Sequence, residues 1–478
     1  MTPSRLPAPS SRICAPDRLM PLDPTARAIA RRLYDSVATL PIVSPHGHTD
    51  PRWYAENAAF PDPATLFVVP DHYVFRMLYA QGVRMEDLGV PTRDGTPVET
   101  DPRAIWQRFA SHYHLFRGTP TRLWLDHAFA ALFGLDERLS AANADAVFDR
   151  IDAALELPAY RPRALFETFG IEVIATTEGA LDDLKWHASL AASGWTGRVV
   201  TTYRPDAVVD PDFEGFAGNL ARLGAITGED TATWKGYLAA HRKRRAVFKA
   251  HGATASDHGH PTATTANLSA SEAEALFRKV ASGPVSASEA DLFRGQMLTE
   301  MARMSLDDGL VMQIHPGSRR NHNAGIFARF GRDMGADIPG PTDYVSALKP
   351  LLDAVGNEPS LTIILFTLDE TAYSRELAPL AGHYPALLLG PPWWFFDSVE
   401  GMKRFKQQAI ETAGFYNTVG FNDDTRAFPS IPARHDVARR VDCAHLAELV
   451  CDGRLDEDEA QELAVDLAYR LAKAAYRL

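Results

Sequence analysis

The sequence predicts an α/β protein built as a distorted (β/α)8 TIM barrel with large helical insertions. Two observations carry this prediction. Eight short apolar runs recur along the 478 residues, and the segments between them have helical character. Continuous apolar runs are typical of strands buried on both faces, and their alternation with helices indicates a parallel sheet. Eight such units fit a barrel, in which function lies at the C-terminal ends of the strands.

The expected strands follow one another from the N-terminal fifth of the chain to its last quarter. Between them, segments such as ALDDLKWHASLAAS and GMKRFKQQAIETAG read as helices, and the C-terminal LDEDEAQELAVDLAYRLAKAAYRL reads as a closing amphipathic helix whose acidic start and basic end suit the helix dipole. The eight expected strands are LPIVSPHGH (40–48), TLFVVPDHY (65–73), IEVIATTEG (171–179), GRVVTTYRPD (197–206), LVMQIHPG (310–317), LTIILFTLD (361–369), PALLLGPPWWF (385–395) and TVGFNDDTRAF (418–428).

The domain organisation expected is one barrel over residues 25–478 after a flexible N-terminal tail, residues 1–24. The intervals 76–165 and 207–305 are too long for simple crossovers and read as helical insertions. The tail is rich in Pro, Ser and Arg and lacks the apolar region of a secretory signal. Translation from Met1 and from Met20 are both compatible with the sequence.

The charge and composition of the chain argue against several classes of binding partner. The formal net charge of −12 repels polyanions, which argues against nucleic acid and against anionic membranes. No stretch reaches the ~18 apolar residues of a membrane helix. The three cysteines, Cys14, Cys443 and Cys451, form no CxxC pair and are too few for a disulfide scaffold, as in a reducing cytoplasm. We therefore expect a cytoplasmic protein with a small-molecule ligand; the oligomeric state, including a homo-oligomer, stays open.

A metal site is predicted where the first and last expected strands end. His46 and His48 stand at i and i+2, so their side chains point to one side of a strand, and imidazole is the commonest metal ligand. Asp424 and Arg426 repeat this spacing, and the first and last strands of a barrel are neighbours. His46, His48 and Asp424 then make a three-ligand set with open positions, as in catalytic sites. The alternatives are a loop that holds two imidazoles and a strand-end salt bridge.

Other polar and aromatic residues follow the remaining runs. Each has a simple structural explanation: an arginine can cap a helix, and a tyrosine or a tryptophan pair can pack in the core. Their joint occurrence at expected C-terminal strand ends favours a site. They are His72 and Tyr73, Arg204, His315 with Arg320 nearby, and Trp393 with Trp394.

These motifs resemble those of uronate isomerase, a divergent family of the amidohydrolase superfamily, from about TARAIARRLYD to the C-terminus. The matching motifs are HGH, DHYVFR, TTYRPD, ASDHG, QIHPGSRRNHN, GPPWWFFD and DDTRAF. The resemblance implies that His46, His48 and Asp424 bind one zinc ion, with other divalent transition metals also compatible. It further implies proton transfer by Tyr73 with Arg204, and substrate binding and electrostatic assistance by Arg426. His72, Arg320 and Trp393 resemble the other substrate contacts, and His315 lies at the fifth-strand position near the metal.

The chain departs from the family pattern in three places. TTEGA (176–180) stands where the family has TTDDP, Ser44 precedes HGH where Asp is common, and the N-terminal tail is longer. The first departure lies at an expected strand end, where it would affect substrate preference.

The implied reaction interconverts D-glucuronate with D-fructuronate and D-galacturonate with D-tagaturonate by proton transfer from C2 to C1 through an enediol. A free tyrosine, with a pKa near ~10, is a poor base, so we expect Arg204 beside Tyr73 to lower its pKa. Asp424 would move a hydroxyl proton during ring opening, and arginines would hold the substrate carboxylate. The alternatives are a mononuclear metal-dependent hydrolase of the same superfamily and a barrel that binds sugar acids without turnover. The preference between the two uronates is not decided by the sequence.

Overall fold

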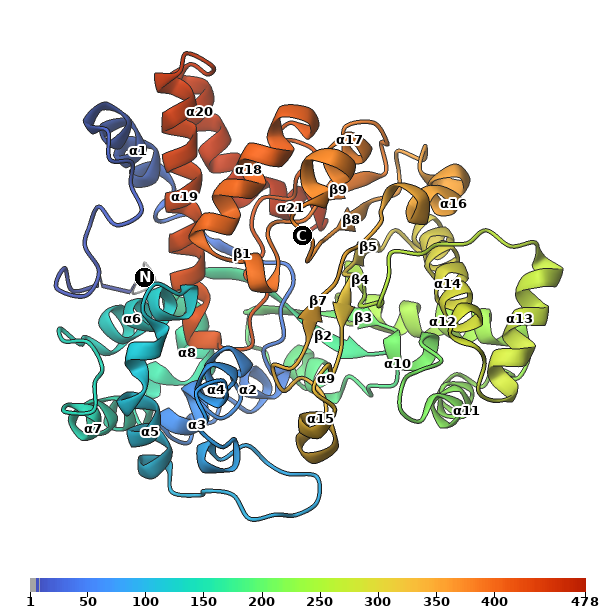
Figure 1. Cartoon of the computed structure of the whole chain (residues 1–478), viewed down its shortest axis with the longest axis horizontal. Coiled ribbons are helices and arrows are strands. Elements are labelled where there is room, and N and C mark those ends of the chain that lie inside the picture. Colours follow the sequence, from blue (N-terminus) through green and yellow to red (C-terminus); the bar gives the residue numbers. More distant parts are fainter. Residues whose placement is uncertain (1–5, 8) are drawn as a thin grey trace.

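The fold is known from a computed structural model, which describes residues 6–7 and 9–478. Its centre is a parallel seven-stranded sheet in the order β1-β2-β3-β4-β5-β8-β9, surrounded by helices (Figure 1). Short strands of this kind, buried on both sides, are what the apolar runs predict. The strands are β1 (Ile42–Ser44), β2 (Ile171–Gly179), β3 (Arg198–Arg204), β4 (Ala255–His258), β5 (Val311–Ile314), β8 (Ile363–Leu365) and β9 (Leu387–Leu389).

The expected last strand, residues 418–428, is not a strand. It makes a single parallel bridge to β9, between Leu389 and Thr418. Further along, the backbone N–H of His48 donates to the carbonyl of Thr425 at 2.9 Å. This irregular segment therefore lies between β9 and the chain that leaves β1, and it closes the distance between the two edges of the sheet.

The expected second strand, residues 65–73, is also wrong, because this stretch is helical. Helix α3 (Pro63–Phe67) is followed by α4 (His72–Tyr79). The side chain of Asp71 caps α4 by accepting a hydrogen bond from the N–H of Tyr73 at 2.8 Å. The helix then buries Val74, Phe75 and Leu78 on one face. The apolar residues Val74 and Phe75 thus belong to the inner face of a capped helix, and Val68 and Val69 lie in the turn that joins α3 to α4.

Strand β4 lies inside the interval 207–305 that we expected to be a helical insertion. Its residues Ser256, Asp257 and His258 are almost completely buried although they are polar. A strand of this composition gives no apolar run, which is why the sequence analysis missed it. The rest of that interval is mainly helical.

Most helices pack around the sheet, and two groups extend to opposite sides of it in Figure 1, α5–α7 and α11–α14. The first group lies in the expected insertion 76–165. A two-stranded hairpin, β6 (Ser318–Arg319) and β7 (Ile338–Pro339), carries α15 (Ala324–Phe330) between its strands. The other helices are α1 (Pro24–Val37), α2 (Pro51–Glu56), α5 (Pro102–Ser111), α6 (Pro120–Phe133), α7 (Ala144–Leu155), α8 (Pro162–Thr168), α9 (Lys185–Ala192), α10 (Asp206–Val209), α11 (Phe216–Thr227), α12 (Trp234–Ala250), α13 (Ala270–Ser282), α14 (Ala287–Asp308), α16 (Val345–Val355), α17 (Ala378–Ala381), α18 (Val399–Ala413), α19 (Ile431–Cys451), α20 (Glu457–Val465) and α21 (Leu471–Ala475). Short 3-10 or π-helical turns are η1 (Glu86–Leu88), η2 (Tyr113–Phe116), η3 (Pro158–Tyr160), η4 (Tyr373–Leu377), η5 (Trp394–Phe396), η6 (Phe428–Ser430) and η7 (Asp466–Arg470).

The segment before α1 contacts the body of the protein, whereas we expected residues 1–24 to be a flexible tail. Ile13 is buried, and its carbonyl accepts a hydrogen bond from Arg138 at 2.8 Å. Arg18 forms an ion pair with Asp436 of α19 at 2.5 Å. Within the residues described, this stretch is held by the same kinds of contact as the rest of the chain.

The described cysteines form no disulfide: Cys14 and Cys443 are buried, and Cys451 is exposed. Among the helices of residues 6–7 and 9–478, none combines the length and the apolar character that a bilayer crossing requires.

Candidate active site

A cavity of about 700 Å³ opens at the C-terminal ends of the strands. Side chains that follow or end β1, β3, β4 and β5 line it, together with the hairpin β6/β7 and the segment 424–427. The carboxyl ends of parallel strands share one edge, so residues distant in sequence meet there. All the residues predicted for the site line this cavity: His46, His48, His72, Tyr73, Arg204, His315, Arg320, Trp393, Asp424 and Arg426.

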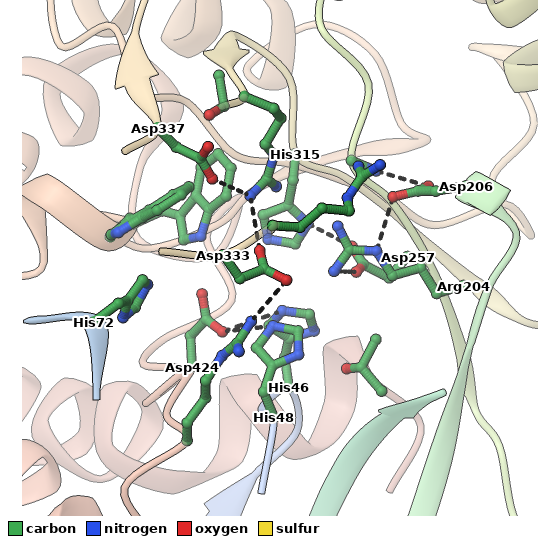
Figure 2. A pocket seen from close by; sticks show the side chains of 18 of the residues that line it. His46, His48, His72, Arg204, Asp206, Asp257, His315, Asp333, Asp337 and Asp424 are labelled. Carbon is green, nitrogen blue, oxygen red and sulfur yellow. Dashed lines mark hydrogen bonds and ion pairs between the residues drawn. The ribbon is translucent and has the colours of Figure 1, made fainter. Parts of the chain in front are cut away.

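His46, His48 and Asp424 form one group, as predicted from the HxH spacing and from the closing segment (Figure 2). The Oδ1 of Asp424 lies 3.5 Å from the Nε2 of His46 and 3.3 Å from the Nε2 of His48. Asp424 has a φ of 39°, in the left-handed region that few non-glycine residues adopt. Such conformations concentrate at functional sites, and this one belongs to the turn that presents the carboxylate.

The protonation states of this group suit metal binding. Burial alone would raise the pKa of the Asp424 carboxyl, but the nearby imidazoles of His46 and His48 hold it well below its usual range. Burial also lowers the pKa of His48 to about 4, against the opposing effect of Asp424. At neutral pH the group therefore offers an anionic oxygen and a neutral imidazole, which are the forms that ligate metals.

A second group shares His46 with Asp257 and His315. The His315 ring stacks on that of His46 with centroids 4.9 Å apart, and His315 Nδ1 lies 2.6 Å from Asp257 Oδ1. Among the described residues, the buried His315 Nε2 lacks a hydrogen-bond partner, and so does His46 Nδ1, the ring nitrogen other than the Nε2 that faces Asp424. Buried polar atoms without partners are rare in proteins. An imidazole binds one ion through one nitrogen, so the donors that fit a divalent cation are the close group at Asp424, with the unpaired His315 Nε2 in the same cavity.

Asp257 was not among the residues predicted for the site. It comes from β4, the strand that the sequence analysis missed, although the motif ASDHG that contains it was noticed. Its two oxygens face His315 and Arg204, the latter with 3.4 Å between Oδ2 and Nη1. The signal in the sequence that could have identified Asp257 was its place in the motif ASDHG, which resembles a motif of the family.

Arg204 does not take the position predicted for it beside Tyr73. Its guanidinium binds Asp206 at 2.8 Å and faces Asp257 (Figure 2). Arg434, at the start of α19, lies near Tyr73, with its guanidinium carbon 5.6 Å from the ring centroid, and Arg76 of α4 lies at 5.8 Å. Arg434 also binds Asp397 at 2.7 Å. Sequence reasoning missed it because it follows no strand.

The pKa of Tyr73 is raised, whereas we predicted it to be lowered. Removal of the phenol from water disfavours the phenolate, and the positive charge of Arg434 opposes this effect without overcoming it. Tyr73 is therefore a neutral phenol at physiological pH, held at the pocket wall by the first turn of α4.

The remaining predicted residues also line the pocket. Arg320 binds Asp337 at 3.0 Å, and Arg426 lies 3.7 Å from Asp333. His72 faces the ring of Trp394, and Trp393 packs edge-on against His315 with centroids 4.6 Å apart. The pocket lining thus combines cations with aromatic rings.

The departure TTEGA places its glutamate outside the pocket. Thr177 and Gly179 line the cavity, but Glu178 alternates to the other side of β2. There it accepts a hydrogen bond from Thr201 and lies 3.7 Å from His187 of α9. We expected this departure to affect substrate preference. Because Glu178 does not line the cavity, any such effect of Glu178 would have to act indirectly.

The fold and the site together define an α/β protein of the enzyme type, with a pocket at its strand ends that combines a histidine–aspartate group able to hold a metal ion with several arginines. Comparison with known proteins then identifies the family. The family model described as glucuronate isomerase matches residues 25–476. The uronate isomerase of Rhizobium meliloti (strain 1021) is 70% identical over 463 residues, 97% of this chain and 99% of that protein.

Solved structures agree with this match. The crystal structure of glucuronate isomerase from Caulobacter crescentus superposes with a TM-score of 0.95 at 62% identity, over 97% of this chain and 96% of that one. Uronate isomerase from Thermotoga maritima gives a TM-score of 0.89 at 27% identity, over 97% and 99%. The chain belongs to the glucuronate isomerase family, and it is a uronate isomerase. This confirms the resemblance and favours isomerisation over hydrolysis or binding without turnover.

Proposed function

We propose that the enzyme converts D-glucuronate to D-fructuronate and D-galacturonate to D-tagaturonate in the described pocket. The observation that carries this proposal is the His46–His48–Asp424 group in one cavity with Arg320 and Arg426. The relatives' names support uronates as substrates. We describe the fold as a distorted (β/α)8 barrel of the amidohydrolase type, in which the irregular segment 418–428 takes the place of the eighth strand.

The metal in this proposal is one zinc ion, held by His46, His48 and Asp424. Zinc takes nitrogen and oxygen ligands and keeps an open position in catalytic sites with three protein ligands. When bound, it polarises the substrate oxygens as a Lewis acid. The low pKa of Asp424 and the neutral state of His48 support this ligand set.

The substrate carboxylate would bind between Arg320 and Arg426, because guanidinium groups match carboxylates in planar, two-pronged hydrogen bonds. Both side chains line the cavity, and Arg426 is 43% exposed and free to adjust. A chain of net charge −12 repels an anionic substrate in general, so this local cluster of cations is needed to hold it.

Proton transfer then falls to Tyr73. The conversion is redox-neutral: C2 loses a hydrogen and becomes the carbonyl carbon, while C1 gains one and becomes an alcohol. Tyr73 would react in its minor phenolate form, which accepts the proton from C2 and returns it to C1, with Arg434 instead of Arg204 stabilising the phenolate. Asp424 would move the hydroxyl proton that ring opening releases. The Asp257–His315 pair would fix the orientation of His315 beside the reacting sugar.

The setting of the enzyme in this proposal is the cytoplasm, with a free hexuronate as its partner and with neither nucleic acid nor membrane. The acidic net charge supports this, because it disfavours polyanionic surfaces. A homo-oligomer is compatible with the proposal.

The proposal is tested by incubating the purified enzyme with each uronate and measuring ketose formation, with zinc determined on the same sample. D-glucose, which lacks the carboxylate, is the control substrate. We expect ketose from the uronates, little from glucose, and about one zinc ion per chain, the number for which the three-ligand site has room. Absence of ketose with both uronates in a zinc-loaded sample would refute the proposal.

A further inference from the structure

Asp333 lines the pocket and comes from the excursion between β6 and β7. In the view of Figure 2 its carboxylate lies between those of Asp337 and Asp424. Its backbone has a φ of 61°, which few non-glycine residues adopt. None of the proposed reaction steps uses this residue, yet it lies beside the arginines proposed to bind the substrate carboxylate.

The carboxylate of Asp333 faces the two arginines proposed to hold the substrate carboxylate. Its Oδ2 lies 3.7 Å from Nη2 of Arg426, and its Oδ1 lies 3.9 Å from Nη1 of Arg320. The arginines Arg320, Arg426 and Arg204 together overcome the effect of burial and lower its pKa, so Asp333 is an anion at neutral pH. An acidic side chain of the protein thus lies between the cations that a uronate needs.

These contacts are weaker than those a substrate can make. Both distances exceed the ~2.7–2.9 Å of a charge-assisted hydrogen bond. Among residues 6–7 and 9–478, no hydrogen bond to the Asp333 carboxylate is found, and the side chain is 46% exposed. Exposed pairs of this kind contribute little to stability, about 0–1 kcal/mol. A carboxylate that binds both guanidinium groups directly would displace Asp333.

The Asp333 side chain lacks the anchors that hold its neighbour Asp337. Asp337, at the end of the excursion, is held by Arg320 at 3.0 Å and by the N–H of Asn321 at 2.6 Å. Gly331 and Gly335 on either side of Asp333 have φ of 91° and 68°, conformations that cost glycine little. Rotation of the Asp333 side chain would therefore break no hydrogen bond within the described part of the chain, while Asp337 stays in place.

We propose that Asp333 is an internal substitute for the substrate carboxylate: it occupies the site between Arg320 and Arg426 in the empty enzyme and withdraws when a uronate binds. This inference rests on the proposed function, because it assumes that these arginines hold a uronate. The apparent affinity for the uronate is then the intrinsic affinity multiplied by the fraction of molecules in which Asp333 has withdrawn. Removing its charge removes that competition.

The test measures KM and kcat of the zinc-loaded enzyme and of Asp333→Asn with D-glucuronate. We expect the variant to lower KM about fivefold to tenfold, the change produced when a site that is about 10–20% available becomes fully available. Asp212→Asn is the matched control. Asp212 also lines the pocket, but it binds Arg294 and is 69% exposed, so the same loss of charge should change KM less than about twofold.

Two readouts keep the inference falsifiable. Inhibition by a neutral hexitol, which has no carboxylate, should be the same in wild type and in Asp333→Asn, and melting curves show whether the variant is folded. An unchanged or higher KM in a folded Asp333→Asn protein overturns the inference while wild-type turnover leaves the proposed function standing. A wild-type enzyme without turnover on either uronate overturns the proposed function and this inference with it.

Discussion

Two histidine–carboxylate groups lie on opposite sides of the sheet, and they have opposite electrostatic character. In the pocket, Asp424 lies 3.5 Å and 3.3 Å from His46 and His48, and its pKa is held well below the usual range. Behind β2, Glu178 lies 3.7 Å from His187, yet burial raises the pKa of Glu178 to about 7 and lowers that of His187 to about 4. Similar distances thus give an anion in one place and a largely neutral pair in the other.

The difference lies in what surrounds each carboxylate. Asp424 faces the imidazoles of His46, His48 and His315 in the cavity, and its interactions with these rings outweigh its loss of hydration. Glu178 is enclosed between strand and helix, and its hydrogen-bond partner is the neutral hydroxyl of Thr201. Proximity of His and Asp or Glu is therefore not enough to mark a functional site; the neighbouring charges and an open volume decide.

The largest effect is expected for Asp424→Asn. This change removes an anionic ligand and the proposed carrier of the hydroxyl proton, so turnover should fall by more than about 10⁴-fold, the product of a metal and a proton-transfer contribution. Ketose formation and zinc content are measured on the same protein. A variant that keeps both would show that the pocket group is no more functional than the pair behind β2.

The second largest loss of turnover is expected for Tyr73→Phe. This variant separates proton transfer from metal binding within the pocket. Loss of one proton-transfer group typically costs about 10²–10⁴-fold in rate. Zinc content should stay at the wild-type level, because Tyr73 is not part of the His46–His48–Asp424 group. Near-normal kcat in this variant would remove Tyr73 from the mechanism.

Much of the sheet could be predicted, because strands buried on both faces must be continuously apolar. The exceptions have particular causes. The stretch 65–73 has the composition of a strand, but Asp71 caps a helix there. Strand β4 satisfies polar residues in the interior, for example by the contact of Asp257 with His315, and such a strand leaves no apolar signal.

The candidate site was predictable where chain spacing alone brings residues together. His46 and His48 are two residues apart in the segment that directly follows β1 (Ile42–Ser44), so their closeness in sequence places both beside the pocket, although neither lies within the strand itself. Asp424 needed only that the two ends of the sheet approach each other. Arg434 and Asp257 could not be assigned roles in this way. Their positions depend on how α19 and β4 pack against the pocket, which no spacing within the chain encodes.

The smallest effect on activity is expected for Glu178→Gln, which tests the group behind β2. Glu178 does not line the cavity, so kcat and KM should change less than about twofold. Its effect should appear in the free energy of unfolding. Since the folded pKa of about 7 lies above the ordinary value of 4.5 for a glutamate carboxyl, the folded state keeps a proton that the unfolded chain releases. This contribution to stability is present at low pH and is lost as pH rises toward and past 7.

The expected size is roughly 2–3 kcal/mol between pH 5 and pH 8, from about 1.4 kcal/mol per unit of pKa. Glutamine keeps the shape without the titration, so Glu178→Gln should gain this amount relative to wild type when the pH is raised from 5 to 8. Urea unfolding at the two pH values measures it, and comparison with wild type cancels the separate titration of His187. If the difference is independent of pH, Glu178 is ionised in the folded protein, and the contrast between the two sides of the sheet fails.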